Sequence, residues 1–298
     1  MPNNALSPVL ITENPDLAAL AQDSGVGRIM VDLERNGKFA RQKNRDTWIS
    51  EHRIEDVAPV ARVLSASDLM VRINPLYDGS AGEIDAAIDG GADCIMLPMF
   101  RTLKEIETIG ALISGRVRFV PLVETGDAMD ILEQVARCDA VDETFIGLND
   151  LHISLGLDFM FQPLGDGMLD AACVKLRDIG KPFGFGGIAR IGEGDLPAEF
   201  IVREHARLGS TRVNLSRTFA RDGLSKGETL EREVRRLLEL YNEALAAPAD
   251  AVAANRAEVQ RRIEVISARI SAGKAQGAGQ SADPSAAEQT TPKQGSAE

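Results

Sequence analysis

The chain has 298 residues, with 33 lysines and arginines against 45 aspartates and glutamates, a net charge of −12. This acidic balance argues against a general affinity for nucleic acid or anionic membranes, because both require basic surface. Hydrophobic residues make up 44% of the chain and aromatic residues only 4%, which predicts a large, mainly aliphatic core.

The predicted elements alternate between strand-type and helix-type runs from residue 8 to about residue 245. The expected strands span residues 8–11, 27–34, 68–75, 94–98, 118–124, 144–149, 182–188 and 211–215. The expected helices span residues 16–23, 54–64, 83–89, 103–113, 128–137, 168–179, 197–208 and 228–245. Strands that alternate with helices indicate a parallel sheet covered by helices.

Eight strand–helix units in roughly 240 residues are typical of a (β/α)8 TIM barrel. The alternative is a doubly wound open sheet. We favour the barrel because no glycine-rich phosphate-binding turn follows the first strand.

The last fifty residues differ from the barrel pattern. Apolar residues recur there at heptad-like spacing, interrupted once by Arg256, and they are Val252, Val259, Ile263, Ile266 and Ile270. Such a helix either seeks a partner surface or folds back on its own barrel. The remaining sequence has no large apolar residue and predicts disorder. We therefore expect a catalytic barrel over residues 1–247, an amphipathic helix over 248–272 and a disordered tail over 273–298.

No apolar run approaches the roughly 18 residues of a membrane-spanning helix. The N-terminal sequence also lacks the basic and apolar regions of a secretory signal. Three scattered cysteines, Cys94, Cys138 and Cys173, are too few for a disulfide framework or a zinc site, so we expect reduced thiols. These features predict a cytoplasmic protein without membrane or nucleic acid partners.

Polar side chains gather where the expected strands end, and active sites of such barrels form at that face. Four of them are carboxylates, Asp32, Glu34, Glu124 and Asp150. Clustered like charges require a nearby cation, and carboxylate ligands favour Mg²⁺, with Mn²⁺ as the alternative. Glu124 and Asp150 lie on adjacent strands and could share the ion. The structural alternative is a surface salt bridge for Glu124 and helix capping by Asp150.

Arg72 lies within an apolar strand. A buried guanidinium needs an anion, since an unpaired buried charge is costly. Two interpretations remain open. Arg72 either pairs with Asp32 or Glu34, or it binds an oxygen of a carboxylate or enolate.

Five motifs around these residues resemble the HpcH/HpaI aldolase and citrate lyase β-subunit superfamily. They occur in the family's order, and they are VDLE (31–34), VRINP (71–75), GADCIMLPMF (91–100), PLVET (121–125) and IGLNDLHISLG (146–156). The resemblance covers roughly residues 8–220.

The resemblance implies a Mg²⁺-dependent barrel that makes or breaks a C–C bond next to a carbonyl group. Carried onto this chain, it makes Glu124 and Asp150 the metal ligands. Arg72 would bind the carbonyl or enolate oxygen of the substrate. The same resemblance suggests a homo-oligomer, as a trimer or hexamer. Our candidate substrate-binding residues at this face are Arg72, Asn74, Pro98, Asn149 and His152, of which His152 could instead cap the segment that follows Asp150.

Three departures weaken any assignment of a substrate. Arg35 stands where one branch has an acidic residue and another has histidine, Met99 replaces a lysine, and Leu148 replaces the usual proline. His52 could supply the missing base if its loop folds back, because imidazole titrates near neutrality. The alternative for His52 is an exposed loop position. We expect His205, in a later helix, to lie on the surface.

We consider three functions. The first is an aldolase that acts through the enolate of pyruvate or a related 2-oxo acid. The second is a lyase or thioesterase for malyl-, citramalyl- or citryl-CoA substrates. Basic residues after the second strand could then bind the CoA tail, and they are Arg35, Lys38, Arg41 and Lys43. The third is a barrel that has lost catalysis and serves as an assembly subunit.

Overall fold

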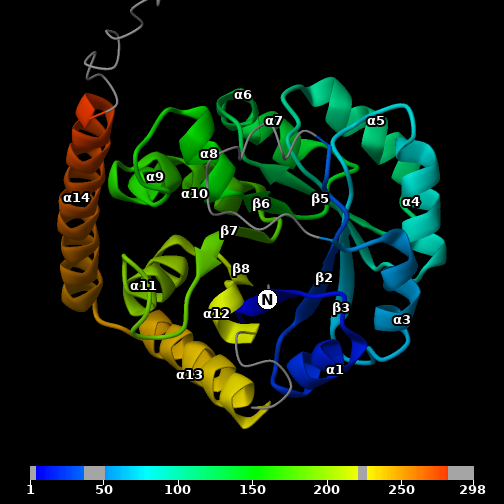
Figure 1. Cartoon of the computed structure of the whole chain (residues 1–298), viewed down its shortest axis with the longest axis horizontal. Helices are drawn as coiled ribbons and strands as arrows, with labels where there is room; N and C mark the ends of the chain where they lie inside the picture. Colours follow the sequence, from blue (N-terminus) through cyan, green and yellow to red (C-terminus); the bar gives the residue numbers. More distant parts are fainter. Residues whose placement is uncertain (1–4, 37–50, 221–226, 281–298) are drawn as a thin grey trace, which may run out of the picture.

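The computed structural model describes residues 5–36, 51–220 and 227–280. Within these residues, eight parallel strands close into a barrel in chain order, with helices around the outside (Figure 1). The strands are β1 (Ser7–Ile11), β2 (Arg28–Asp32), β3 (Asp68–Arg72), β4 (Cys94–Leu97), β5 (Arg118–Val123), β6 (Thr144–Ile146), β7 (Phe183–Ile188) and β8 (Arg212–Leu215). The expected (β/α)8 barrel is thereby confirmed over the open sheet.

The helices that follow these strands agree with the expected order. They are α1 (Pro15–Asp23), η1 (Ile54–Asp56), α3 (Val57–Ala61), α4 (Ser80–Asp89), α5 (Leu103–Ile113), α6 (Gly126–Asp130), α7 (Leu132–Arg137), α10 (Met168–Ile179), α11 (Ala198–Leu208) and α13 (Gly227–Leu245). Within the described parts, no helix combines the length and apolar character needed to cross a membrane.

The region after β6 differs from the expectation. Strand β6 ends at Ile146, and helix α8 (Leu148–Ser154) begins two residues later. Asp150 therefore lies in the first turn of a helix rather than at a strand end. Two further short helices, α9 (Gln162–Gly165) and α12 (Arg217–Ala220), occupy segments where we expected loops.

Side chains alternate between the two faces of each barrel strand. Outward side chains join a large aliphatic core with the surrounding helices. Inward side chains form a second cluster that fills the barrel, and it consists of Val9, Met30, Met70, Cys94, Met96, Val120, Leu122 and Phe145. The interior is thus a packed core, as in other barrels of this type.

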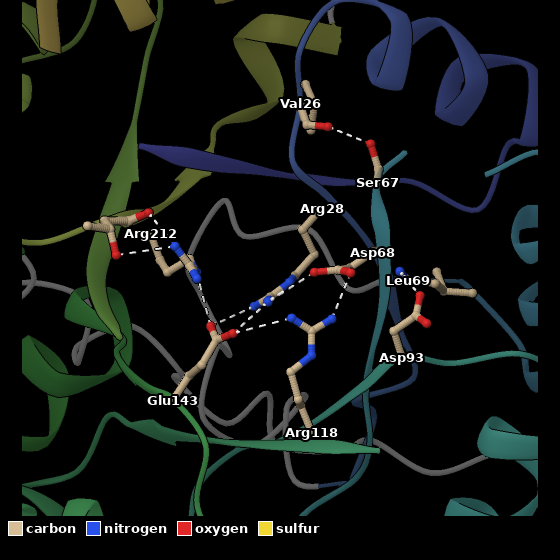
Figure 2. Close-up of polar contacts among 10 residues, drawn as sticks. Val26, Arg28, Ser67, Asp68, Leu69, Asp93, Arg118, Glu143 and Arg212 are labelled. Atoms are coloured by element: carbon tan, nitrogen blue, oxygen red, sulfur yellow. Dashed lines mark hydrogen bonds and ion pairs between the residues drawn. The ribbon is translucent and has the colours of Figure 1, made fainter. Parts of the chain in front are cut away.

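An ionic cluster occupies the end of the barrel where the strands begin (Figure 2). Glu143 binds Arg28 through both oxygens, at 3.0 and 2.8 Å, and accepts a hydrogen bond from Arg212 at 3.1 Å. Asp68 joins Arg118 at 2.7 Å and lies 3.5 Å from Arg28. Burial opposes ionisation of Glu143, but Arg28 and Arg212 outweigh it and lower the pKa of Glu143 to about 2.

The C-terminal helix α14 (Ala249–Gln280) continues past residue 272, where we expected it to end. It lies beside α9 and α11 of its own barrel (Figure 1). The apolar seam is buried there at Val259, Ile263 and Ile266. Arg256, which interrupts the seam, pairs with Asp170 at 2.8 Å. In the single chain, the helix therefore folds back on its own barrel.

His205 is buried, so the expected surface position was wrong. Its ring stacks on Phe185 with centroids 3.8 Å apart, and its Nδ1 lies 2.8 Å from the Ser210 hydroxyl. Burial lowers the pKa of His205 to about 3.

Candidate active site

The best-defined contact at the carboxyl ends of the strands joins Arg72 to Asp32. These are the last residues of β3 and β2, and they are paired in the sheet register. Arg72 donates from Nε and Nη2 to the two oxygens of Asp32, at 2.8 and 2.7 Å. Its Nη1 lies 3.6 Å from Oε2 of Glu34. The ion pair considered from the sequence therefore exists, and it leaves Nη1 as the nitrogen that Asp32 does not bind.

The charge of Arg72 is strongly favoured. Burial by itself would lower the pKa of the guanidinium, but the carboxylates of Asp32 and Glu34 outweigh this effect and raise the pKa. The site consequently holds a permanent cation next to two buried carboxylates.

Glu124 follows β5 directly and is only 3% exposed. Its Oε1 accepts a hydrogen bond from the backbone N–H of Met99 at 3.0 Å. Met99 has a φ of 55°, a left-handed conformation that is rare for a residue with a side chain. This turn after β4 directs the N–H of Met99 at Glu124.

Gly147 allows Glu124 its position. A Cβ atom at residue 147 would lie 2.9 Å from Oε2 of Glu124 and 3.0 Å from its Cβ. The backbone of Gly147 has an ordinary φ of −87°. The need for glycine thus arises from close approach to Glu124 and not from backbone strain.

The surroundings of Glu124 disfavour its ionised form. Burial and then the carboxylates of Glu34 and Asp150 raise the pKa of Glu124 well above its usual range, against the opposing effect of Arg72. A cation at this place would remove the conflict. The donors are two hard carboxylates, Glu124 and Asp150, which suit Mg²⁺ or Mn²⁺ completed by water and substrate oxygens.

Glu124 and Asp150 fit an ion site in which other coordination positions stay open. In the described ranges 5–36, 51–220 and 227–280, no group of three or more His, Cys, Asp or Glu side chains is arranged to hold a metal. Two carboxylates that leave other positions to water or substrate are the usual protein contribution to a Mg²⁺ site. The residues therefore fit a catalytic cation better than a structural one.

His52 lies next to the end of β2. Its ring is 7% exposed, and its Nδ1 accepts a hydrogen bond from the backbone N–H of Asp32 at 3.0 Å. Its Nε2 lies 2.7 Å from Oε2 of Glu13. His52 thus connects the end of β2 with Glu13, which follows β1.

Asn74 contacts the protein rather than an open space. Its Oδ1 accepts from the backbone N–H groups of Arg35 and Asn36, at 2.9 and 3.0 Å. Its Nδ2 donates to Oε1 of Glu83 at 2.7 Å. The side chain therefore fixes the chain that leaves β2.

The remaining candidates lie around the same mouth. Pro98 is buried beside Met99, and Asn149 is partly buried in α8. His152 is buried, with its Nδ1 3.3 Å from the carbonyl oxygen of Leu148. Arg35 is exposed, and its guanidinium donates to the carbonyl oxygens of Glu51 and His52. Lys38, Arg41 and Lys43 lie outside the described residues.

Comparison with known proteins shows which family the chain belongs to. The family model for HpcH/HpaI aldolase/citrate lyase matches residues 10–186. The chain belongs to the HpcH/HpaI aldolase/citrate lyase family. It is therefore an enzyme of the carbon–carbon lyase class.

Relatives within this family are distant. A 2-keto-3-deoxy-L-rhamnonate aldolase from Escherichia coli (strain K12) is 24% identical over 204 residues, which cover 58% of this chain and 71% of the relative. A family protein from Burkholderia cenocepacia superposes with a TM-score of 0.58 at 16% identity, covering 80% of this chain and 96% of the other. The citrate lyase β subunit from M. tuberculosis, complexed with oxaloacetate and magnesium, gives 0.53 at 16% identity, with 78% and 97% covered. At such identity the two structures show a shared fold.

Sequence reasoning missed Glu13 and Glu83 as parts of the site. Glu13 follows the first strand by two residues, so the search of strand ends could have included it. Glu83 lies on α4, where only the fold brings it to Asn74.

Proposed function

We propose that the protein is a divalent-metal-dependent aldolase that cleaves or forms a C–C bond through the enolate of pyruvate or a related 2-oxo acid. The observation that carries this proposal is Glu124, a buried carboxylate whose charge conflicts with Glu34 and Asp150 and lies within the field of Arg72. Glu124 and Asp150 would hold Mg²⁺, with Mn²⁺ as the alternative. Such an ion supplies a Lewis acid that polarises the substrate carbonyl and shares the charge of the enolate.

Arg72 has a role in stabilising charge that appears only as the reaction proceeds. Nε and Nη2 are held by Asp32, so the guanidinium is fixed in one plane and Nη1 remains for the enolate oxygen. A donor that is already in place costs no reorganisation when negative charge develops. Asp32 acts as the residue that orients Arg72.

Proton transfer is assigned to Glu34 rather than His52. Because Nδ1 of His52 accepts from the Asp32 N–H, the neutral ring carries its proton on Nε2, directed to Glu13. His52 therefore positions the end of β2. Glu34 is 1% exposed and lies beside Arg72, so its carboxylate would take the hydroxyl proton of the longer substrate as the C–C bond breaks. The products are an aldehyde and, after protonation of the enolate carbon, a 2-oxo acid.

A free 2-oxo acid is favoured over an acyl-CoA thioester as substrate. Arg35, one of the basic residues that could hold a CoA tail, donates instead to two carbonyl oxygens of its own loop. The relative from Escherichia coli is named as an aldolase of a free 2-keto acid, which supports the same choice. The test compares pyruvate–aldehyde condensation with cleavage of malyl-, citramalyl- and citryl-CoA. We expect turnover in the first assay, and thioester cleavage alone would overturn the choice.

We also propose a cytoplasmic homo-oligomer of three or six copies, on the basis of the family resemblance. Light scattering coupled to size-exclusion chromatography measures the assembly directly, and a monomer at micromolar concentration would contradict it.

A further inference from the structure

Asn214 is an inward-facing polar residue that the reaction described above does not use. Its strand neighbours Val213 and Leu215 belong to the outer aliphatic core, so the side chain between them points into the barrel. In the sheet register it pairs with Val9 of the interior cluster on one side and with Gly187 on the other.

The amide of Asn214 lacks a partner within the described residues. Its Oδ1 is buried and receives no hydrogen bond. A buried acceptor without a donor is costly, so native proteins rarely keep one without a reason. The residue as a whole is nevertheless partly exposed.

That exposure opens toward the carboxyl ends of the strands. Gly187, beside Asn214, is partly exposed, whereas Gly184 and Val9 are buried. Gly187 has no side chain to cover this place, whereas Gly186 is buried and faces Leu148 of the outer core. Solvent therefore reaches Asn214 past the backbone of Gly187, from the same end of the barrel as Arg72 and Glu124.

An apolar side chain lies next to this opening. Ile11 is two residues beyond Val9 on β1, which places it on the inward face, and it is 37% exposed. Strands β1 and β5 lie on opposite sides of an eight-stranded barrel closed in chain order. Ile11 and Asn214 consequently lie across the mouth from Glu124.

We propose that Asn214, Ile11 and the backbone of Gly187 form a subsite for the aldehyde half of the substrate, and that Asn214 selects an aldehyde with a hydroxyl group next to its carbonyl carbon. A carboxamide both donates and accepts, and so does a hydroxyl group, so the two match in either orientation of the amide. Ile11 packs against the carbon chain. This inference rests on the proposed aldolase function, because it assigns the second substrate of that reaction.

The kinetic test compares glyceraldehyde with propionaldehyde, each condensed with pyruvate. We expect the wild type to prefer glyceraldehyde. Asn214→Ala should lower kcat/KM for glyceraldehyde about tenfold, the usual effect of one lost hydrogen bond, and leave propionaldehyde within twofold. The retained propionaldehyde activity shows that the variant is folded.

Asn255→Ala is the matched control, because Asn255 on α14 also has an unpaired Oδ1 and lies outside the barrel. Equal losses for both aldehydes would overturn the subsite.

A binding measurement separates this inference from the proposed function. In ¹H–¹⁵N spectra, the side-chain amide signal that Asn214→Ala removes should shift on addition of glycerate and stay unchanged with propionate, which shares the carboxylate but lacks the hydroxyl groups. If the wild type condenses no aldehyde but glycerate still shifts this signal, the aldolase proposal fails and the subsite stands. An unchanged signal with glycerate overturns the subsite, whatever the activity.

Discussion

Arg72 derives its importance from geometry as well as charge. Asp32 holds two of its nitrogens, and a lysine at this position could not make that paired contact while presenting a third nitrogen to the substrate. We therefore expect Arg72→Lys to lower kcat about 100-fold or more, with a small change in KM for pyruvate. Steady-state kinetics measures both, and Arg101→Lys, in an exposed pair with Asp127, is the matched control. A change confined to KM would show that Arg72 binds substrate and transition state equally.

Gly147 offers a test of the acidic pair in which neither proposed ligand residue is itself substituted. A methyl group at residue 147 meets Glu124 and must displace its carboxylate. Gly147→Ala should weaken Mg²⁺ binding about tenfold or more, while unfolding remains cooperative. Gly82→Ala is the control, because a Cβ there meets nothing within 4 Å. Equal Mg²⁺ affinity of both variants and the wild type would contradict the position assigned to the metal.

His205 contributes to the way the free energy of unfolding depends on pH. Its pKa is about 3 in the folded protein against 6.5 ordinarily, so between these values the unfolded chain binds more protons. The free energy of unfolding should fall as pH drops from 6.5 to 3, by up to about 4 kcal/mol from this residue. In His205→Phe, which can still stack on Phe185, this part of the slope should disappear in denaturant titrations. An unchanged slope would mean that the ring is already charged in the fold.

At the scale of the elements, the sequence predicts strands better than it predicts the short helices between them. All eight expected strands are present, because each is a run of apolar residues buried on both faces. Helix α8 was missed because its few residues, LNDLHIS, are too short to display a helical period. The burial of His205 was predictable, since Ile201, His205 and Leu208 share one face of α11. The contacts of His52 and Asn74 were not, because they join segments that only the closed barrel brings together.

Helix α14 contributes to stability through its buried seam. Ile263 is 3% exposed and packs so closely against Gly165 that a Cβ there would lie 2.9 Å from it. Ile263→Ala should reduce the free energy of unfolding by about 2–5 kcal/mol. Val265→Ala, on the same helix but 59% exposed, should change it by less than about 0.5 kcal/mol. Equal effects in chemical denaturation would show that the helix does not pack on its own barrel in solution.

In the whole molecule, charged side chains gather at both ends of the barrel, and the balance of charge differs between the two ends. At the end where strands begin, Arg28, Arg118 and Arg212 neutralise Glu143 and Asp68, so that end needs no ligand. At the other end, within the part of the chain that the structure describes, Arg72 lies in the field of Asp32, Glu34 and Glu124, and Glu124 is also close enough to Asp150 to feel its charge. This excess of carboxylate was predictable from the strand ends, and it is the part of the net charge of −12 that bears on function. The ionic cluster at the opposite end was missed, although its members lie at or next to the starts of their strands.

The measurement that tests the account most directly is calorimetric titration of Mg²⁺ into the wild type, Glu124→Gln and Asp150→Asn. The account predicts that each substitution weakens Mg²⁺ binding about tenfold or more, because each removes one of two charged ligands. Glu133→Gln, in an exposed pair with Arg137, should bind like the wild type. Unchanged affinity in both ligand variants would contradict a metal site at Glu124 and Asp150.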